Sequence, residues 1–226
     1  MLNMRDLSRV YRTDTVETTA LDGVNLDIED GEFVAIMGPS GCGKSTLLNV
    51  IGMLDSPTDG SYLFNGTEVS KMSESKLADF RKRNIGFIFQ SFNLVDELTV
   101  RENVELALLY HNIPAAERRS RVDKVLDKVG IAHRAKHRPT QLSGGQQQRV
   151  AVARALVGTP KLILADEPTG NLDTAHGEEV MRMLRQLNQE GSTIVMVTHS
   201  PAHADFASRV VNMLDGKILQ ERRRAA

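Results

Sequence analysis

The sequence predicts an α/β protein built on a parallel, doubly wound sheet. In the C-terminal half, apolar strands alternate with amphipathic helices, as in "KLILAD" (161–166), "GEEVMRMLRQLNQ" (177–189) and "TIVMVTH" (193–199). This alternation is typical of sheets whose parallel strands are joined by helices. A chain of 226 residues with 41% hydrophobic residues is long enough for one large domain or a domain with subdomains.

The first forty residues predict the first strands of a sheet. Short strands are expected at 2–12, 18–28 and 32–37, with a turn at Asp30-Gly31 before the third. A glycine-rich bend follows, and "KSTLLNVIGML" (44–54) then carries apolar residues at helical spacing. The bend therefore lies between a strand and a helix.

The middle of the chain is periodic and rich in charge. A strand at 60–66 ends in Asn65-Gly66, and another is expected at 84–90. Amphipathic helices are predicted at 99–110 and 116–130, which we assign to a helical subdomain of about 91–140. We expect a single domain over 1–226, with the catalytic core formed by about 1–90 and 141–226.

The last third completes the alternation. A helix is expected over 143–158 and a short one near 201–207, with final strands at 209–214 and 217–221.

Composition excludes several classes of protein. The formal net charge of −1 gives no overall attraction to nucleic acid, and the single cysteine, Cys42, rules out an internal disulfide. No window approaches the roughly 18 consecutive apolar residues that span a bilayer, and the N-terminus does not read as a signal segment. We therefore expect a cytoplasmic protein that does not cross a membrane.

The glycine bend matches the phosphate-binding pattern G-x-x-x-x-G-K-[ST]. Its glycines allow backbone amides to approach phosphate oxygens, and the helix that follows adds its positive N-terminal end. Lys44 supplies a cation for the outer phosphates, and the Ser45 hydroxyl is a candidate Mg²⁺ ligand. The candidate nucleotide-binding residues here are Gly38, Pro39, Ser40, Gly41, Cys42, Gly43, Lys44, Ser45 and Thr46.

A second motif narrows the chemistry to hydrolysis. The buried strand "KLILAD" ends in Asp166, where a carboxylate can hold Mg²⁺ through water, and Glu167 follows at once. Glu167 is the candidate general base for the water that attacks the γ-phosphate. The alternative, an acidic pair that only caps a strand before Pro168, has less support once the phosphate-binding loop is present.

The string "LSGGQQQR" (142–149) predicts a second anion site. Ser143 stands where an N-cap belongs, two glycines expose backbone amides, and a long helix follows. One triphosphate loop together with a second phosphate reader nearly a hundred residues later suggests that two copies of the chain share nucleotides.

With these motifs, the sequence closely resembles the nucleotide-binding subunits of ABC transporters from about Leu2 to Glu221. The resemblance implies a P-loop NTPase (RecA-like) parallel-sheet core, an N-terminal antiparallel β subdomain and an inserted α-helical subdomain. It also implies a head-to-tail homodimer in which the signature motif reads ATP on the partner's loop. The signature residues that would bind nucleotide are Ser143, Gly144, Gly145 and Gln146.

Further roles follow from the resemblance, residue by residue. Gln90 in "FIFQSFN" looks like the glutamine that contacts Mg²⁺ and the attacking water, and His199 looks like the switch histidine near the γ-phosphate. Asp173 in "GNLD" would face the partner subunit, although many relatives have Ser-Ala where Gly170-Asn171 stand. Tyr11 is the candidate for stacking on adenine, against the alternative of a strand tyrosine that packs on its neighbours.

Within this family the chain looks most like the subgroup of lipoprotein-release and macrolide-exporter ATPases. The resemblance implies ATP and Mg²⁺ as cofactors and an integral membrane permease with an extracytoplasmic domain as partner, through which hydrolysis powers export or mechanical work. Through the permease it also implies a periplasmic or extracellular adaptor. It places the chain on the cytoplasmic face of the inner membrane. It also predicts that the Gln90 loop and the helical region after it form a groove for a short cytoplasmic helix of the permease.

Two other functions stay open at this point. A regulatory ABC ATPase would signal to a membrane protein without transport, and sequence alone does not separate it from an exporter. A soluble ABC ATPase acting on nucleic acid or ribosomes generally carries two cassettes or a long coiled coil, and this chain has neither, so no nucleic-acid partner is expected. A P-loop kinase is disfavoured because "LSGGQ" has no role in one.

Overall fold

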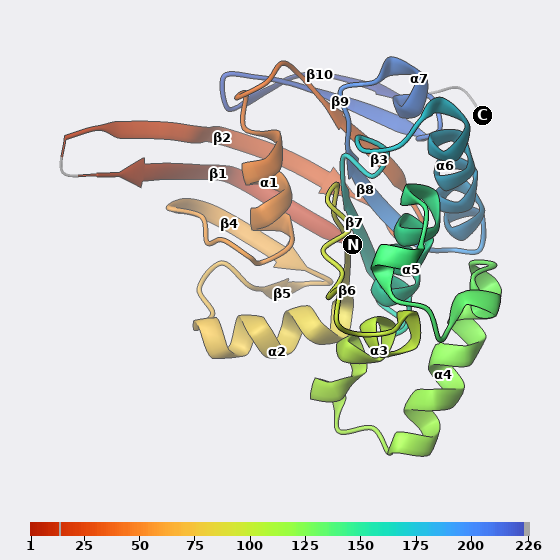
Figure 1. The fold of residues 1–226 in the computed structure, drawn as a ribbon. Helices are drawn as coiled ribbons and strands as arrows, with labels where there is room; N and C mark the ends of the chain where they lie inside the picture. The colour runs from red at the N-terminus through yellow and green to blue at the C-terminus, as the bar shows by residue number, and fades with distance from the viewer. Residues whose placement is uncertain (14, 224–226) are drawn as a thin grey trace.

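The computed structural model describes residues 1–13 and 15–223. Two sheets and the helices that pack on them make up the molecule (Figure 1). The alternation of strands and helices along the C-terminal half confirms the predicted α/β class.

The larger sheet has six strands in the order β10-β9-β3-β8-β7-β6. All neighbouring pairs are parallel except β9 and β10, which are antiparallel. The strands are β3 (Phe33–Met37), β6 (Ile85–Ile88), β7 (Leu162–Asp166), β8 (Thr193–Val197), β9 (Arg209–Leu214) and β10 (Lys217–Arg223).

The parallel strands are buried on both faces, which explains their continuous apolar sequences. Ile163 and Ala165 of β7 belong to one hydrophobic core, whereas Leu162 and Leu164 belong to the other. Successive side chains of a strand point to opposite faces of the sheet. The sheet therefore separates the two cores.

The smaller sheet is antiparallel, with the strand order β2-β1-β4-β5. Its strands are β1 (Leu2–Arg12), β2 (Glu17–Ile28), β4 (Asp59–Phe64) and β5 (Thr67–Glu68). The Asn65-Gly66 turn joins β4 to β5 with both residues at positive φ (48° and 75°), as a tight two-residue hairpin turn requires. The β1–β2 ribbon projects from the body of the molecule (Figure 1).

Helices cover both faces of the larger sheet. On one side, α1 (Lys44–Ile51) shares a hydrophobic core with β1 and β2. On the other side, the core includes residues from α5 (Gly144–Leu156), α6 (Thr174–Gln189) and α7 (Pro201–Ala204). The remaining helices are α3 (Val100–Glu105), η1 (Leu106–His111), α4 (Ala115–Lys128), η2 (Ala132–Arg134) and η3 (Pro139–Gln141).

Helix α2 (Glu74–Asn84) was not predicted from the sequence, and neither were the short elements β5, η2 and η3. Only Leu77 of this helix is buried, so the segment has no apolar stripe that would reveal a helical period. Helix α6 also begins at Thr174, three residues before the expected start, because Asp173 is its N-cap. The other expected elements are present, with ends shifted by a few residues and with the helix expected at 99–110 divided into α3 and η1.

One buried arginine joins the two sheets. The Arg209 side chain on β9 is only 4% exposed and forms ion pairs with Glu32 (2.7 Å) and Glu221 (2.9 Å). It also donates a hydrogen bond to the carbonyl oxygen of Asp27 on β2. The Arg209 guanidinium therefore binds the residue before β3, a residue of β10 and the backbone of the antiparallel sheet.

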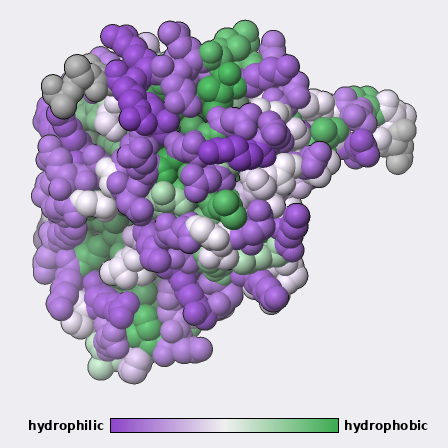
Figure 2. Space-filling model, turned by 180° about the vertical axis from the view of Figure 1, so that it is seen from behind, coloured by the Kyte–Doolittle hydropathy of each residue, from purple (hydrophilic) through white to green (hydrophobic). Residues whose placement is uncertain are grey.

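Within residues 1–13 and 15–223, no helix has the length and apolar character to cross a bilayer. Seen from behind, the surface is mainly hydrophilic, with the hydrophobic residues in small groups (Figure 2). This distribution is ordinary for a domain whose apolar strands are internal.

Candidate functional site

The phosphate-binding loop connects β3 to α1. Gly43 is the N-cap of α1 and supplies no side chain to the helix amides, which stay free for a ligand. Its φ is 101°, and a Cβ on it would lie 2.4 Å from the Ala20 carbonyl oxygen of β2. Only glycine allows the loop to take this path and pack this close to β2.

Lys44 lies inside the loop, with 7% of its surface exposed. Its ammonium donates hydrogen bonds to the carbonyl oxygens of Gly38 (2.9 Å) and Pro39 (2.7 Å), and the Cys42 sulfur is 3.9 Å away. An ammonium held by neutral carbonyls is available to the phosphate oxygens of a nucleotide, which are stronger acceptors. Cys42 is itself buried.

A cavity of about 470 Å³ opens over this loop. It brings the loop together with two residues that lie far along the chain, Glu167 and His199. Three residues of β2 also line it. The lining residues are Thr18, Thr19, Ala20, Gly38, Ser40, Gly41, Gly43, Lys44, Ser45, Thr46, Glu167 and His199.

Glu167 and His199, the candidate base and switch histidine, contact each other. Glu167 Oε2 is 3.1 Å from His199 Nδ1, and the two side chains are 25% and 70% exposed. The Glu167 backbone has a φ of 44°, which is uncommon for a residue with a side chain. Hydrogen bonds from Glu167 N to Val197 O (3.0 Å) and from Gly170 N to Glu167 O (2.9 Å) hold this conformation. The Glu167 backbone is thus fixed beside the loop.

Asp166 ends β7 next to this cavity. Burial raises the pKa of its carboxyl, the negative charge of Glu167 raises it further, and Lys44 opposes both effects. A divalent cation would relieve the repulsion between these two carboxylates.

The oxygen donors beside the cavity fit Mg²⁺, which phosphate and water also ligate, better than a metal ion whose ligands are all protein side chains. The described residues contain no group of three His, Cys, Asp or Glu side chains that could hold a metal. Ser45 and Asp166 offer a hydroxyl and a carboxylate oxygen, and Mg²⁺ typically takes few protein ligands together with phosphate and water oxygens.

Gln90 follows β6 but does not line the cavity. Its side chain packs on Gly170, where a Cβ would lie 2.7 Å from Gln90 Nε2, and Asn171 Nδ2 donates to the Gln90 carbonyl at 3.1 Å. The pair Gly170-Asn171, which departs from the common family pattern, therefore contacts Gln90, and Arg154 donates hydrogen bonds to the carbonyl oxygens of Phe92 and Asn93 in the same segment. The roles of Gln90 toward Mg²⁺ and water stay predictions.

Tyr11 lies beside the cavity on β1. Its register partner on β2 is Thr18, which lines the cavity, and opposed residues of neighbouring strands project to the same face. The Tyr11 hydroxyl donates to Asp55 Oδ2 (2.7 Å), and the Arg9 guanidinium lies 4.5 Å from the ring centroid. One face of the Tyr11 ring lies against Arg9, and the residue is 40% exposed. Stacking of the ring on adenine stays a prediction.

Three of the four signature residues, Ser143, Gly145 and Gln146, line a separate hollow of about 300 Å³, and Gly144 does not. Ser143 caps α5, as expected, and forms a capping box with Gln146 (3.1 and 3.3 Å). The hollow is lined by Gly130, Ile131, His133, Ser143, Gly145, Gln146, Arg149, His176 and Glu179. It shares no lining residue with the cavity over the phosphate-binding loop.

Gly144 opens the first turn of α5, directly after Ser143. Asp173 caps α6, with Oδ1 accepting from His176 N at 3.0 Å.

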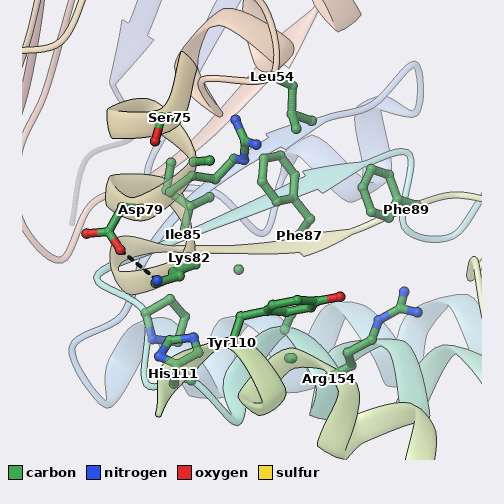
Figure 3. A pocket seen from close by; sticks show the side chains of 17 residues that line it. Leu54, Ser75, Asp79, Lys82, Ile85, Phe87, Phe89, Tyr110, His111 and Arg154 are labelled. Carbon is green, nitrogen blue, oxygen red and sulfur yellow. Dashed lines mark ion pairs between the residues drawn. The ribbon is translucent and has the colours of Figure 1, made fainter. Parts of the chain in front are cut away.

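An apolar groove of about 630 Å³ lies between α2, β6 and η1. Phe87 and Tyr110 face the same space from opposite sides, with Phe89 and Arg154 at one end (Figure 3). The rings of Phe87 and Phe89 stack with centroids 5.6 Å apart, and Tyr110 is 76% exposed. Gln90 directly follows Phe89, so the groove adjoins the Gln90 segment.

Several residues of these sites carried no sequence signal. Thr18, Thr19 and Ala20 face the cavity only because β2 packs on the loop. Gln148 is fully buried and donates to the Pro168 carbonyl at 2.6 Å, which links α5 to the residue after Glu167. No motif indicated these contacts, because they depend on packing between distant segments.

Comparison with known sequences gives consistent results. A sequence model of the family described as "ABC transporter" matches residues 21–170. An uncharacterized ABC transporter ATP-binding protein of Thermotoga maritima is 50% identical over 96% of this chain and 93% of its own length. The macrolide export ATP-binding/permease protein MacB of Brucella melitensis is 47% identical over 98% of this chain, which corresponds to 34% of MacB.

Solved structures agree with the fold. The ATP-binding cassette MJ0796, described as a dimer in a post-hydrolysis state bound to ADP and Pi, superposes with a TM-score of 0.91. It is 43% identical, and each chain covers 100% of the other. CbiO1 of Clostridium perfringens, described as part of the transporter complex cbiONQ, has a TM-score of 0.88 and 32% identity, covering 98% of this chain and 88% of CbiO1.

Proposed function

This chain belongs to the ABC transporter family of ATP-binding proteins, and we propose that it is the ATP-hydrolysing subunit of an export or mechanotransmission complex. The family relationship makes it an ATPase with a P-loop NTPase fold. The cavity that joins the phosphate-binding loop to Glu167 and His199 is the observation that carries the proposal.

The geometry supports hydrolysis by positioning and charge neutralisation. The free amides at the start of α1 and the Lys44 ammonium bind the phosphates and neutralise their charge. Glu167, whose backbone is fixed at the cavity, accepts a proton from the attacking water. His199, with Nδ1 3.1 Å from Glu167 Oε2, orients the Glu167 carboxylate. When bound through Ser45, Asp166 and Gln90, Mg²⁺ would neutralise charge on the phosphate oxygens.

A head-to-tail homodimer would complete each site. The signature hollow and the nucleotide cavity share no lining residue in one chain, so the residues Ser143–Gln146 and Asp173 would act on the nucleotide of a second copy. The similar cassette MJ0796 is described as a dimer. Two shared nucleotides per dimer follow from this arrangement.

The groove of Figure 3 supports a membrane partner. Its apolar floor and exposed Tyr110 would receive a short cytoplasmic helix of a permease, and movement there would reach Gln90 through Phe89. MacB joins an ATP-binding part and a permease in one chain, as its name states, and this chain corresponds to 34% of it. We therefore place the protein on the cytoplasmic face of the membrane, with an adaptor reached only through the permease.

The test traps the ATP-bound dimer and identifies the proteins that purify with it. Glu167→Gln removes the base and keeps the phosphate-binding loop, so ATP should convert the variant to a dimer in light scattering, whereas Lys44→Ala should stay monomeric. Mass spectrometry of proteins purified with tagged Glu167→Gln from detergent-solubilised membranes should show a permease that is depleted with Lys44→Ala.

Two other results would contradict the dimer or the membrane role. A Glu167→Gln chain that stays monomeric with ATP and Mg²⁺ would contradict the shared-site dimer. Recovery of ribosomal proteins or DNA without a permease would leave the ATPase intact and exclude the membrane role.

A further inference from the structure

His176 connects two segments of the signature side. On one side, its Nδ1 lies 2.6 Å from Asp173 Oδ2, and its backbone amide donates to Asp173 Oδ1. On the other side, its ring packs on the signature glycine: a Cβ on Gly145 would lie 2.5 Å from His176 Cδ2 and 3.0 Å from Cγ. The imidazole therefore touches the α6 cap and the first turn of α5 at once.

The charged groups around this ring come from three elements. Asp173 and Glu179 on the α6 side favour the imidazolium, and Arg149 of α5 disfavours it. Arg149 pairs with Glu179 at 2.9 Å and donates to the Val129 carbonyl. His133 of η2 lines the same hollow.

We propose that His176 is a positioning residue of the composite ATP site, which fixes the Asp173 carboxylate and ties it to the first turn of the signature helix. The inference rests on the proposed function, because Asp173 and the signature residues meet a nucleotide only in the head-to-tail dimer. His176 acts through these groups and touches no substrate itself.

We expect this pairing to make dimer formation depend on pH, because an Asp173 carboxylate that is already held in place loses less conformational freedom when it meets the second copy. The hydrogen bond to Asp173 and then its charge raise the pKa of His176, while the two hydrogen bonds from His176 lower the pKa of Asp173. The charged pair is complete while His176 is protonated and Asp173 ionised, and it is lost as pH rises through the raised pKa of His176. ATP-driven dimerisation should therefore weaken from about pH 6 to about pH 9.

A histidine titration tests the pair in the nucleotide-free full-length chain. In ¹³C-histidine-labelled protein, the His176 ring signal, assigned by its absence in His176→Gln, should titrate above the ordinary range of a histidine side chain. Asp173→Asn should lower the His176 midpoint, because it removes the charge and the acceptor that raise the pKa of His176. An unchanged midpoint in Asp173→Asn would overturn the pairing.

Dimer formation tests the functional part. In the Glu167→Gln background, sedimentation with ATP and Mg²⁺ should show a several-fold rise in the dimer dissociation constant between about pH 6 and about pH 9. Adding His176→Gln should remove most of this dependence, whereas the matched change His133→Gln, in the same hollow, should keep it. Binding of fluorescent ATP to the monomer should be the same in all three, which a misfolded variant would not show.

The dimerisation experiment distinguishes failure of this inference from failure of the proposed function. If His176→Gln leaves the pH dependence of dimerisation unchanged, the inference is wrong and the proposed function stands. If no ATP-driven dimer forms at any pH, the shared-site function fails and this inference fails with it.

Discussion

The residue that would activate water carries a strained backbone. Glu167 has a φ of 44°, and such conformations cost on the order of 1–3 kcal/mol when the residue is not glycine. Hydrogen bonds to Val197 and from Gly170 hold it there, and the Glu167 carboxylate consequently points into the nucleotide cavity beside His199. Strain at this position is consistent with a role in catalysis.

At the same scale, we predict different costs for two alanine substitutions in the phosphate-binding loop. Gly43→Ala adds a Cβ 2.4 Å from the Ala20 carbonyl oxygen, whereas the equivalent Cβ on Gly41 meets nothing within 4 Å, although its φ of 80° is also positive. Gly41→Ala should therefore lose about 1 kcal/mol of unfolding free energy from backbone strain alone, and Gly43→Ala distinctly more.

Urea unfolding and ATP titration would measure both variants. Gly43→Ala should also bind ATP more weakly, because β2 and the loop must separate. Equal stability of the two variants would show that contact with β2 does not set the path of the loop.

Single residues were predictable from sequence only where a motif fixes their spacing. The loop glycines, Lys44, Ser143, Asp166 and Glu167 were found in this way. The Arg9 and Asp55 contacts around Tyr11 were not, because they join β1 to the segment before β4 and no local pattern reports such a contact. The roles of these residues toward nucleotide stay predictions.

At the scale of elements, α5 and the loop after β7 are joined by a buried amide. Gln148 Nε2 donates to the Pro168 carbonyl, and Gln148 Oε1 is buried with no hydrogen-bond partner within residues 1–13 and 15–223. The signature helix is therefore linked to the residue that follows Glu167. A shift of α5 against the partner would reach the candidate base by this contact.

We predict that Gln148→Leu separates binding from catalysis. The Pro168 carbonyl loses its donor, but an unpaired acceptor is also removed, so the net loss of stability should be only about 1 kcal/mol. The turnover number at saturating ATP should fall several-fold while monomer affinity for ATP stays the same. Gln147→Ala, at a partly exposed neighbour, is the matched control.

Steady-state ATPase assays and fluorescent-nucleotide binding would check this. A Gln148→Leu chain with normal turnover would mean that the contact only supports packing.

Elements were predictable where their apolar residues repeat. Strands β3, β7 and β8 were expected because they are buried on both faces, and α6 because it buries one stripe. Helix α5 was expected from the N-cap signal at Ser143, although its residues 150–153 are buried all round. Helix α2 escaped prediction because one buried leucine gives no period. The pairing of β3 with β8 and β9 also lay beyond the sequence, since strand order depends on contacts between distant segments.

At the scale of the whole molecule, Arg209 adds a buried polar link between two sheets that also share a hydrophobic core. Removing one partner of a buried ion pair typically costs about 3–5 kcal/mol, because the remaining charges stay buried without compensation. We therefore predict that Arg209→Met lowers the unfolding free energy by about this amount, leaving Glu32 unpaired in its 12% exposed position.

The matched control is Arg5→Met. Arg5 also forms an ion pair with a carboxylate, Asp27, but both side chains are 52% exposed, so little change in stability is expected. Urea denaturation followed by circular dichroism would compare the two. Equal effects would show that Arg209 adds no stabilising link between the sheets.

The strand order has a consequence for how the protein is made. The first strand of the larger sheet, β3, has the apolar sequence "FVAIM", and its neighbours β8 and β9 are residues 193–197 and 209–214. During synthesis, β3 leaves the ribosome on the order of ten seconds before either neighbour exists, at the usual elongation rates. Throughout that interval the nascent chain carries an unpaired hydrophobic strand, so its yield in the cell should depend on chaperones that shield such segments until translation ends.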